Sequence, residues 1–265
     1  MLGAGAGAGL LAGLLGIGGG MVLVPVLDAC FAAVGVPSAE RMHLAVGTSM
    51  SCIVPTALIS ARRHWQRSAV DLTLGTRWGP ACALGAVVGS GIAMHLDGRW
   101  LAGIFGTLAC LAGIHGLWSR ASRSGLQQFS GWGPPPRGVW WSLPVGIGSV
   151  SAMMGIGGGT FSVPLLRAMG YKVHDAVGTS AWLGAWIALP AALAYLLVRA
   201  PTSHAAGYTL GHVNLLALAL LVPVTMWLAP KGVALAHALP PRKLGLAFGA
   251  FLLLAGGRML HQAFG

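Results

Sequence analysis

Two glycine-rich runs could do chemistry in this chain, because they can expose backbone N–H groups to a ligand. The runs are residues 16–20 and 155–159, and a proline follows each of them five residues later, at Pro25 and Pro164. Glycine costs about 1 kcal/mol relative to alanine inside a helix, and proline cannot donate an amide hydrogen bond. Each run therefore predicts two short helices joined by an unwound stretch.

A helix that begins after such a break presents unpaired N–H groups and the positive end of its dipole. It can bind an anion without a charged side chain. We expect two such helices, starting near Gly20 and Thr160, to meet at an axis that relates the two runs. The predicted ligands at the breaks are Gly18, Gly19, Gly20, Gly157, Gly158, Gly159 and Thr160. The alternative is close helix packing, since both runs are also small-xxx-small patterns.

A second matched element follows each run and supplies hydroxyl groups. Residues 43–49 have the sequence His-Leu-Ala-Val-Gly-Thr-Ser, and residues 174–180 have His-Asp-Ala-Val-Gly-Thr-Ser. Small hydroxyl groups suit the oxygen atoms of a sulfur or phosphorus oxyanion, so we expect them to add donors to the site. These hydroxyl groups belong to Thr48, Ser49, Thr179 and Ser180. The alternative is a hydrogen bond from each hydroxyl back to the preceding helical turn.

Four ionisable side chains also occupy matched positions. His43 and His174 could carry protons or face the anion, although snorkelling to the membrane interface explains them as well. Asp28 and Arg167 lie in otherwise apolar segments, and a buried ionisable residue in a membrane is a functional candidate. The alternatives are a structural pair between them, or an Arg167 that reaches the interface.

The paired motifs predict a duplicated chain. Its parts are residues 1–118 and 139–265, joined by a basic, Pro- and Gly-rich linker at 119–138 that suits an exposed connection. We expect each part to contain one glycine-broken element and then three ordinary spans. The expected spans are residues 43–61, 78–96, 100–118, 176–198, 212–229 and 244–262.

Composition predicts that these elements lie in a membrane. Of the 265 residues, 55% are hydrophobic and only 8% are charged, whereas a soluble domain carries about 25% charged residues. A helix needs roughly 20 apolar residues to cross a bilayer, and stretches of about that length recur along the chain. A β-barrel would need alternating apolar and polar residues instead. The predicted class is an all-α integral membrane protein in contact with the lipid bilayer.

The net charge of +11 would suggest a nucleic-acid partner in a soluble protein. Here the basic residues are dispersed in interhelical loops, so we expect them to face anionic lipid and expect no nucleic acid. The four cysteines form no CxxC pair, and the nine histidines have no metal-ligand spacing such as HExxH. We expect no metal, no cofactor and no catalytic residue.

Charge counting favours one of two topologies. If both broken elements cross the membrane, the basic residues divide nine against seven between its sides. If both are re-entrant hairpins, they divide twelve against four, which is a normal cytoplasmic excess. The hairpin topology puts loops 62–77, 119–138 and 230–243 in the cytoplasm and both termini outside it. Three true spans per part invert the second repeat relative to the first, as in many secondary transporters.

Together these motifs resemble the sulfite exporter TauE/SafE family, also called the toluene-sulfonate uptake permease family. The resemblance rests on a duplicated G-x-G-G-G-x-x-x-x-P element followed by A-V-G-T-S. These motifs stand here at residues 16–25 and 45–49, and again at 155–164 and 176–180. The resemblance extends over essentially the whole chain. It implies a transporter of the bacterial inner membrane for sulfite, sulfonates, sulfoacetate or related sulfur-containing anions.

One position departs from the repeat, and two other function classes fit less well. Met21 stands where the second copy has Thr160, which argues against identical ligands from the two copies. An intramembrane enzyme would need a carboxylate pair or a nucleophile motif, and neither stands out. A channel or a carrier for another small ion would be expected to expose buried carboxylates or carbonyl rings. Asp28 is the one deep candidate for that role.

Overall fold

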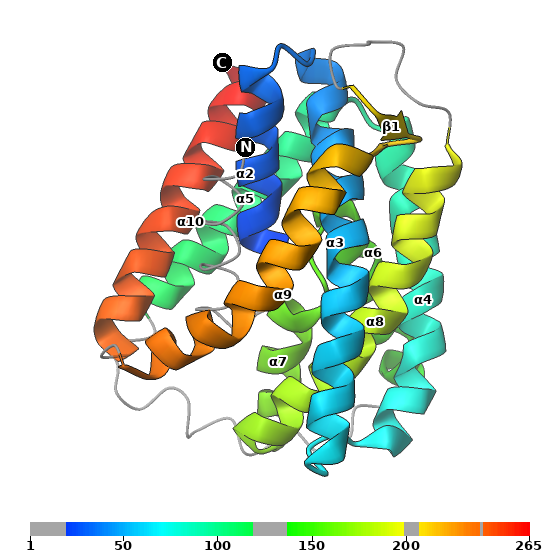
Figure 1. The fold of residues 1–265 in the computed structure, drawn as a ribbon. Helices are drawn as coiled ribbons and strands as arrows, with labels where there is room; N and C mark the ends of the chain where they lie inside the picture. The colour runs from blue at the N-terminus through cyan, green and yellow to red at the C-terminus, as the bar shows by residue number, and fades with distance from the viewer. Residues whose placement is uncertain (1–19, 119–136, 199–206, 239–240) are drawn as a thin grey trace.

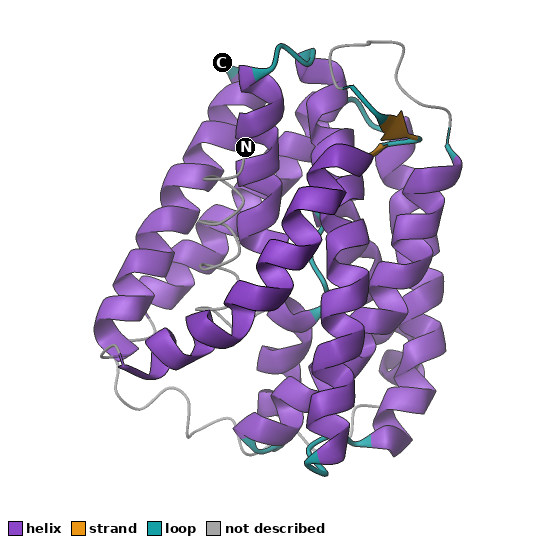
Figure 2. Ribbon diagram, viewed as in Figure 1, coloured by secondary structure: helices purple, strands orange, loops and turns teal. Residues whose placement is uncertain are grey.

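The computed structural model describes residues 20–118, 137–198, 207–238 and 241–265, and within them it is a bundle of helices (Figures 1 and 2). The helices before residue 119 are α2 (Gly20–Ala33), α3 (Ser38–Gln66), α4 (Leu72–His95) and α5 (Gly98–Trp118). Those after residue 136 are α6 (Arg137–Met154), α7 (Gly159–Ala168), α8 (Val173–Leu197), α9 (Leu215–Ala238) and α10 (Pro241–Phe264). Two short antiparallel strands, β1 (Thr209–Leu210) and β2 (Val213–Asn214), form a hairpin between α8 and α9.

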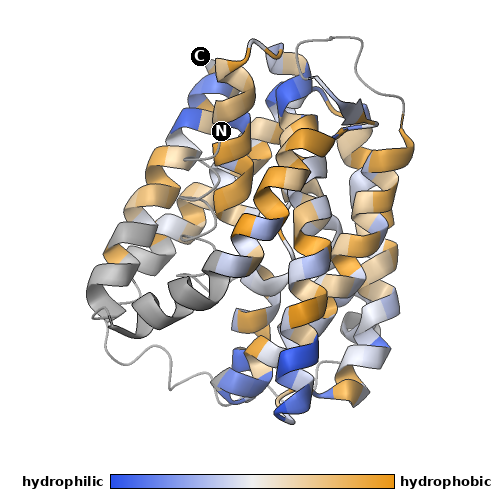
Figure 3. Cartoon of the chain, in the orientation of Figure 1, coloured by the Kyte–Doolittle hydropathy of each residue, from blue (hydrophilic) through white to orange (hydrophobic). Residues whose placement is uncertain are grey.

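The lengths and hydropathy of the helices are those of a membrane protein. Among the described residues, α3 and the stretch His174–Leu197 of α8 are long and apolar enough to cross a bilayer. Helices α4, α9 and α10 have 24 residues each. At 1.5 Å per residue each is about 36 Å long, which exceeds a hydrocarbon core of about 30 Å. Hydrophilic residues collect at the two ends of the bundle and apolar residues lie between them (Figure 3).

The outer surface carries more large apolar side chains than is usual for a protein in water. Leu84 is 59% exposed, Leu111 is 56% exposed and Leu254 is 76% exposed. Extended apolar surface of this kind marks contact with a membrane or a partner. The predicted class, an all-α membrane protein, is confirmed.

Matched helices in the two parts of the chain run in opposite directions. In Figure 1, α3 descends while α8 rises beside it. Gly47 in the first third of α3 packs on Tyr195 near the end of α8, and Gly178 near the start of α8 packs on His64 near the end of α3. An inverted repeat requires these directions. The division of the chain at residues 119–138 lies largely outside the described residues and stays a prediction.

The second broken element enters and leaves at the same end of the bundle. Trp140 in the first turn of α6 packs on Trp78 near the start of α4, with ring centroids 5.5 Å apart. At the other end of the element, Tyr171 donates a hydrogen bond of 2.7 Å to Asp71, the N-cap of α4. Both ends of the α6–α7 element therefore lie beside the N-terminal end of α4. The element turns back within the bundle, as the predicted re-entrant hairpin requires.

Glycine lets α4 and α6 approach until their backbones touch. A Cβ at Gly85 would overlap the carbonyl oxygen of Val145, and one at Gly89 would overlap that of Ser149. The hydroxyl of Ser149 donates a hydrogen bond of 2.9 Å to the carbonyl oxygen of Gly85. Small residues at a close crossing are the usual basis of helix association in membranes. This packing holds the hairpin in place beside α4.

Candidate functional site

The candidate site is the unwound stretch inside the α6–α7 hairpin. Helix α6 ends at Met154, α7 begins at Gly159, and every residue between them is buried. Gly155 has φ +70° and Gly158 has φ +60°, a conformation that glycine adopts at no steric cost. The second glycine run therefore breaks the helix where the sequence predicts it.

The start of α2 packs directly against this stretch. A Cβ at Gly20 would overlap the carbonyl oxygen of Gly155 and would lie 2.8 Å from the Cα of Ile156. Ile53, near the middle of α3, would touch a Cβ added at either Gly20 or Gly157, at 3.1 and 2.6 Å. The N-termini of α2 and α7 therefore approach each other midway along the bundle. From there α2 runs to one end and α7 to the other (Figure 1).

Several hydrogen-bond donors at this meeting point lack an acceptor. Helix α2 is described from Gly20 onward, and its residues Gly20 to Leu23 are buried. In the second break, the N–H groups of Gly157 and Thr160 have no acceptor among the described residues. The hydroxyl groups of Thr160 and Ser162 are buried and also unpaired in that part of the chain. Gly18 and Gly19, predicted as ligands, lie outside the described residues.

Two buried indole N–H groups also lack a hydrogen-bond acceptor. Trp78 of α4 and Trp182 of α8 bury their Nε1 atoms without a partner within the described ranges. Ser162 and Leu166 share the buried face of α7, and Leu166 belongs to the same apolar cluster as Trp78. An indole N–H can only donate, and leaving a buried donor unpaired costs free energy. This surplus of donors favours a ligand rich in acceptors, and no sequence motif marks the two tryptophans.

The two threonines predicted as ligands have partners from distant segments of the chain. The hydroxyl of Thr48 accepts a hydrogen bond of 3.0 Å from the backbone N–H of Asn214. The hydroxyl of Thr179 accepts one of 3.0 Å from the backbone N–H of Asp71. Each hydroxyl keeps a proton that it can donate, so contact with a substrate stays a prediction for both. Asp71 and Asn214 were not predicted, although a polar cap before an apolar run is a signal that could have found them.

The two serines of the same motifs are buried beside the threonines. Ser49 donates a hydrogen bond of 2.8 Å to the carbonyl oxygen of Gly155 and so ties α3 to the break. Ser180 is 2% exposed. Ser49 is therefore the predicted hydroxyl that the structure places in contact with the unwound stretch.

The matched histidines have different surroundings. The Nε2 of His43 lies 3.0 Å from the carbonyl oxygen of Ala93 and 3.1 Å from that of Leu96, so this ring links α3 to the end of α4. His174 is exposed in the first turn of α8. Neither has a contact with the break among those that the structure describes. A relay role for them stays a prediction.

Asp28 and Arg167 do not form the expected pair. The buried carboxylate of Asp28 lies 3.5 Å from the Nε of Arg41 and 3.3 Å from an Nη of Arg258. Arg167 instead donates a hydrogen bond of 2.8 Å to the carbonyl oxygen of Tyr171. The reason is that α2 and α7 run from the break to opposite ends, which carries matched residues apart. Asp28 joins α2, α3 and α10, and Arg167 lies at the outer end of α7.

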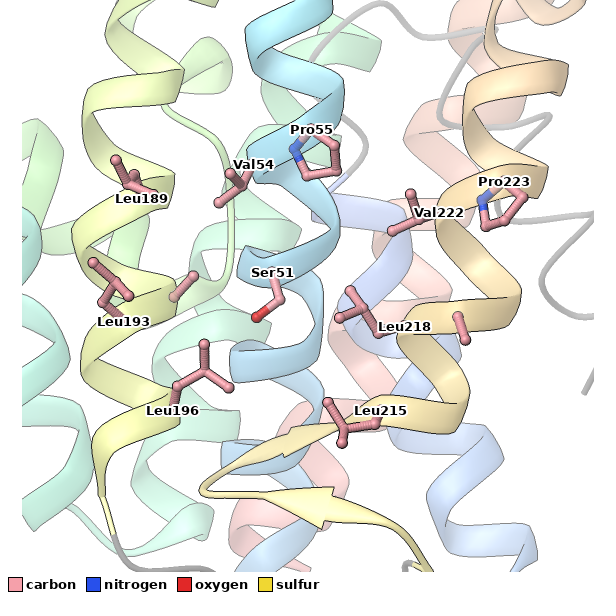
Figure 4. A pocket seen from close by; sticks show the side chains of 12 residues that line it. Ser51, Val54, Pro55, Leu189, Leu193, Leu196, Leu215, Leu218, Val222 and Pro223 are labelled. Atoms are coloured by element: carbon pink, nitrogen blue, oxygen red, sulfur yellow. The ribbon is translucent and has the colours of Figure 1, made fainter.

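A separate groove of about 550 Å³ lies between α3, α8 and α9 (Figure 4). Its lining is apolar except for Ser51, whose hydroxyl donates a hydrogen bond of 2.9 Å to the carbonyl oxygen of Gly47. None of its lining residues in the described part of the chain is charged. Because a buried anion needs hydrogen-bond donors, this groove is not suited to hold one.

The chain is similar to known proteins along nearly its whole length. A family model described as sulfite exporter TauE/SafE matches residues 1–259. A probable membrane transporter protein of Haemophilus influenzae is 31% identical over 255 residues, which cover 96% of this chain and 95% of that protein. One from Xylella fastidiosa is 34% identical over 189 residues (68% and 66%), and one from Methanocaldococcus jannaschii is 25% identical over 268 residues (95% and 91%). No solved structure matches the chain.

Proposed function

The chain belongs to the sulfite exporter TauE/SafE family of membrane transporters, and from this we propose that it carries a small sulfur-containing anion, such as sulfite or an organosulfonate. The observation that supports an anion is the approach of two half-helix N-termini, those of α2 and α7, at a buried break. The positive ends of both helix dipoles point to one place. Half-helix N-termini directed at an anionic group near the bilayer midplane also recur among transporters.

The proposed ligands are neutral donors. In the first break they are the backbone N–H groups of residues 18–20, and in the second they are those of Gly157 and Thr160 together with the hydroxyl of Thr160. The N–H groups of Gly158 and Gly159, which were also predicted as ligands, already donate to the carbonyl oxygens of Ile156 and Gly157. The hydroxyl groups of the Ala-Val-Gly-Thr-Ser segments adjust selectivity. Burying an anion without such donors costs many kcal/mol. Each neutral hydrogen bond contributes about 1 kcal/mol net, so several together hold the anion and still allow its release. A fixed arginine in the same place would slow that release.

The positions of the carboxylates favour an anion over a cation. The chain has five acidic residues. Asp28 is about 12 Å along α2 from Gly20, at 1.5 Å per residue, and lies beside two arginines. The other four lie at or next to helix ends, and these are Glu40, Asp71, Asp97 and Asp175. Over the described ranges, no three His, Cys, Asp or Glu side chains come together as a metal site would require.

The basic end of the bundle is proposed to face the cytoplasm of a bacterial cell. Residues 62–77, which comprise the end of α3, the connection after it and the start of α4, contain four arginines. The C-terminal ends of α5 and α9 lie at the same end of the molecule (Figure 1). The positive-inside rule assigns such an end to the cytoplasm, and the inner membrane is the bilayer in which that rule applies.

Reconstitution into liposomes tests the substrate. We expect saturable uptake of labelled sulfite or of a sulfonate such as toluenesulfonate, and no uptake of labelled sodium alone. Gly158→Leu should abolish this flux, because Gly158 has φ +60° and a Cβ there would meet Ile187 at 2.7 Å. Gly146→Leu is the matched control, since a Cβ at Gly146 meets nothing within 4 Å. Sodium flux without anion flux, or normal anion flux through Gly158→Leu, would refute the proposal.

A further inference from the structure

Gly47 and Thr48 of α3 hold the loop that leads into α9. A Cβ at Gly47 would overlap the carbonyl oxygen of His212, so only glycine admits this loop. The backbone N–H of Asn214 donates to the hydroxyl of Thr48 at 3.0 Å. Asn214 also caps α9, because its Oδ1 accepts a hydrogen bond of 2.7 Å from the N–H of Ala217. We call this contact the first Gly-Thr joint.

Gly178 and Thr179 of α8 hold the loop that leads into α4 in the same way. A Cβ at Gly178 would overlap the carbonyl oxygen of Ala69. The backbone N–H of Asp71 donates to the hydroxyl of Thr179 at 3.0 Å, and Asp71 caps α4 by accepting a hydrogen bond of 3.0 Å from the N–H of Leu74. This is the second Gly-Thr joint, and it repeats the first at the opposite end of the bundle.

Beyond the second joint, α4 packs tightly against α8; we call this contact closed. A Cβ at Gly75 would lie 2.7 Å from the indole Cδ1 of Trp182. A Cβ at Gly79 would lie 2.8 Å from the indole of Trp186. Two tryptophans of α8 thus fill the space against two glycines of α4, which leaves no room between these helices.

Beyond the first joint, the matched helices α9 and α3 are separated by a groove. Counted from the caps and from the threonines, the matching positions are Leu218 and Val222 on α9, and Ser51 and Pro55 on α3. All four line the groove of about 550 Å³ (Figure 4). Neither position of α3 carries an indole, whereas both matching positions of α8 do. The joints are alike, whereas the helices beyond them are closed on one side and open on the other.

We propose that the two Gly-Thr joints are pivots: α9 closes onto α3 while α4 opens from α8, and this exchange exposes the anion site to each side of the membrane in turn. The proposal rests on the transport function proposed above. Because the joints use the same atoms in both parts, the exchange leaves their hydrogen bonds intact. It also yields two arrangements of similar free energy, which a carrier needs in order to alternate.

A cysteine pair across the groove tests the exchange. In a variant whose four native cysteines are replaced by alanine, Ser51→Cys with Leu218→Cys should form a disulfide in oxidised membranes, because α9 reaches α3 in the exchanged arrangement. We expect the disulfide to lower sulfite flux about tenfold or more, as blocking a necessary conformational step does. A reducing agent should restore the flux. Each single-cysteine variant, oxidised in parallel, is the control and should transport normally.

The cross-linking result tests the movement of the helices independently of which anion is carried. Absence of the disulfide, or a disulfide that leaves flux unchanged, would overturn the exchange of open and closed contacts. The yield of disulfide does not depend on which anion is carried. A protein that cross-links but carries no sulfite before oxidation would therefore contradict the substrate alone and support the exchange.

The register of cross-linking tests the pivot itself. With the joint intact, Ser51→Cys should react several-fold more with Leu218→Cys than with Leu215→Cys, which lies one turn nearer to the joint. Thr48→Val should abolish this preference because it removes the acceptor, and Thr48→Ser should retain it. A preference that survives Thr48→Val would show that the joint does not position α9.

Hydrogen exchange tests the joints on the unaltered protein, so the result does not depend on whether a variant folds. The backbone N–H groups of Asn214 and Asp71 precede their helices and donate to the two threonine hydroxyls. They should exchange as slowly as amides inside α4 and α9. Exchange at the rate of free loop amides would contradict the joints.

Discussion

At the scale of single residues, Thr160 distinguishes the two breaks. It lies in the first turn of α7, and its hydroxyl is buried without a partner within the described residues. The matched residue of α2 is Met21, which offers no donor. The two copies therefore present similar backbone donors and different side chains. We therefore expect an anion at the proposed site to be held asymmetrically.

Replacing Thr160 by valine should weaken binding of sulfite or a sulfonate several-fold, because one neutral hydrogen bond is worth about 1 kcal/mol. Equilibrium binding to the purified protein measures this. Thr225→Val is the control, since that buried hydroxyl donates a hydrogen bond of 2.8 Å to Leu221 in its own helix. Equal affinity in the Thr160 variant and the unaltered protein would remove this hydroxyl from the site.

His212, in the turn between β1 and β2, should make the hairpin sensitive to acid. Burial lowers the pKa of His212 below its ordinary value of 6.5, nearby His43 lowers it further, and Glu40 opposes the shift. The folded hairpin thus prefers the neutral imidazole. Its contribution to stability is full above pH 6.5 and is lost as the pH falls from there through the lower folded pKa.

Melting temperatures of the solubilised protein test this pH dependence. Between about pH 7.5 and pH 5.5, where histidine changes charge, the unaltered protein should lose more stability than the variant His212→Gln. The variant carries no titrating group at this position. Identical losses in the two proteins would show that His212 is not the responsible group.

At the scale of elements, the position of the half-helix α7 depends on the glycine contacts between α4 and α6. Helix α7 has ten residues, which is about 15 Å at 1.5 Å per residue and reaches from the middle of the bundle to one end. A short helix of this kind cannot be stable alone in water. Its position depends on α6, and α6 depends on its backbone contact with α4.

Gly89→Leu should therefore damage the protein, whereas Gly91→Leu should not. A Cβ at Gly89 would overlap the carbonyl oxygen of Ser149 in α6, while one at Gly91 meets nothing within 4 Å. Overpacking a tight contact costs about 1–3 kcal/mol or more. We expect a lower melting temperature and less monodisperse protein for the first variant only. Equal behaviour of the two variants would contradict the close α4–α6 crossing.

At the scale of the whole molecule, the directions of the helices determine which loops share a side of the membrane. The end of α3 and the hairpin before α9 lie at opposite ends of the bundle in Figure 1. The proposed anion site lies between them, where Gly20 of α2 meets the break before α7. Access from either side must therefore change the packing at one end without changing it at the other.

Cysteines at Gln66 and Tyr208 should react with a membrane-impermeant thiol reagent from opposite sides. Both residues are exposed, Gln66 at the end of α3 and Tyr208 before the hairpin. In a background without native cysteines, we expect Gln66→Cys to react only from the cytoplasmic side and Tyr208→Cys only from the outside. Labelling of both from one side would contradict the antiparallel arrangement.

The sequence by itself determined the features that depend on local backbone preference and on transfer into lipid. Too few charges to cover a soluble surface predicted a helical membrane protein. Runs of glycine followed by proline predicted broken helices, and the second run does separate α6, which ends at Met154, from α7, which begins at Gly159. The excess of basic residues on one side predicted the hairpin that α6 and α7 form. Each of these signals lies within one segment or follows from composition.

Only the tertiary structure decided which distant groups meet. Thr48 and Thr179 hold the caps of helices more than 100 residues away along the chain, and no periodicity encodes such a pairing. Asp28 lies beside Arg41 and Arg258 instead of Arg167, because antiparallel halves carry matched residues to opposite ends. The groove beside α9 likewise depends on the spacing between helices. That spacing follows from how α3, α8 and α9 pack together, which no single segment of the sequence determines.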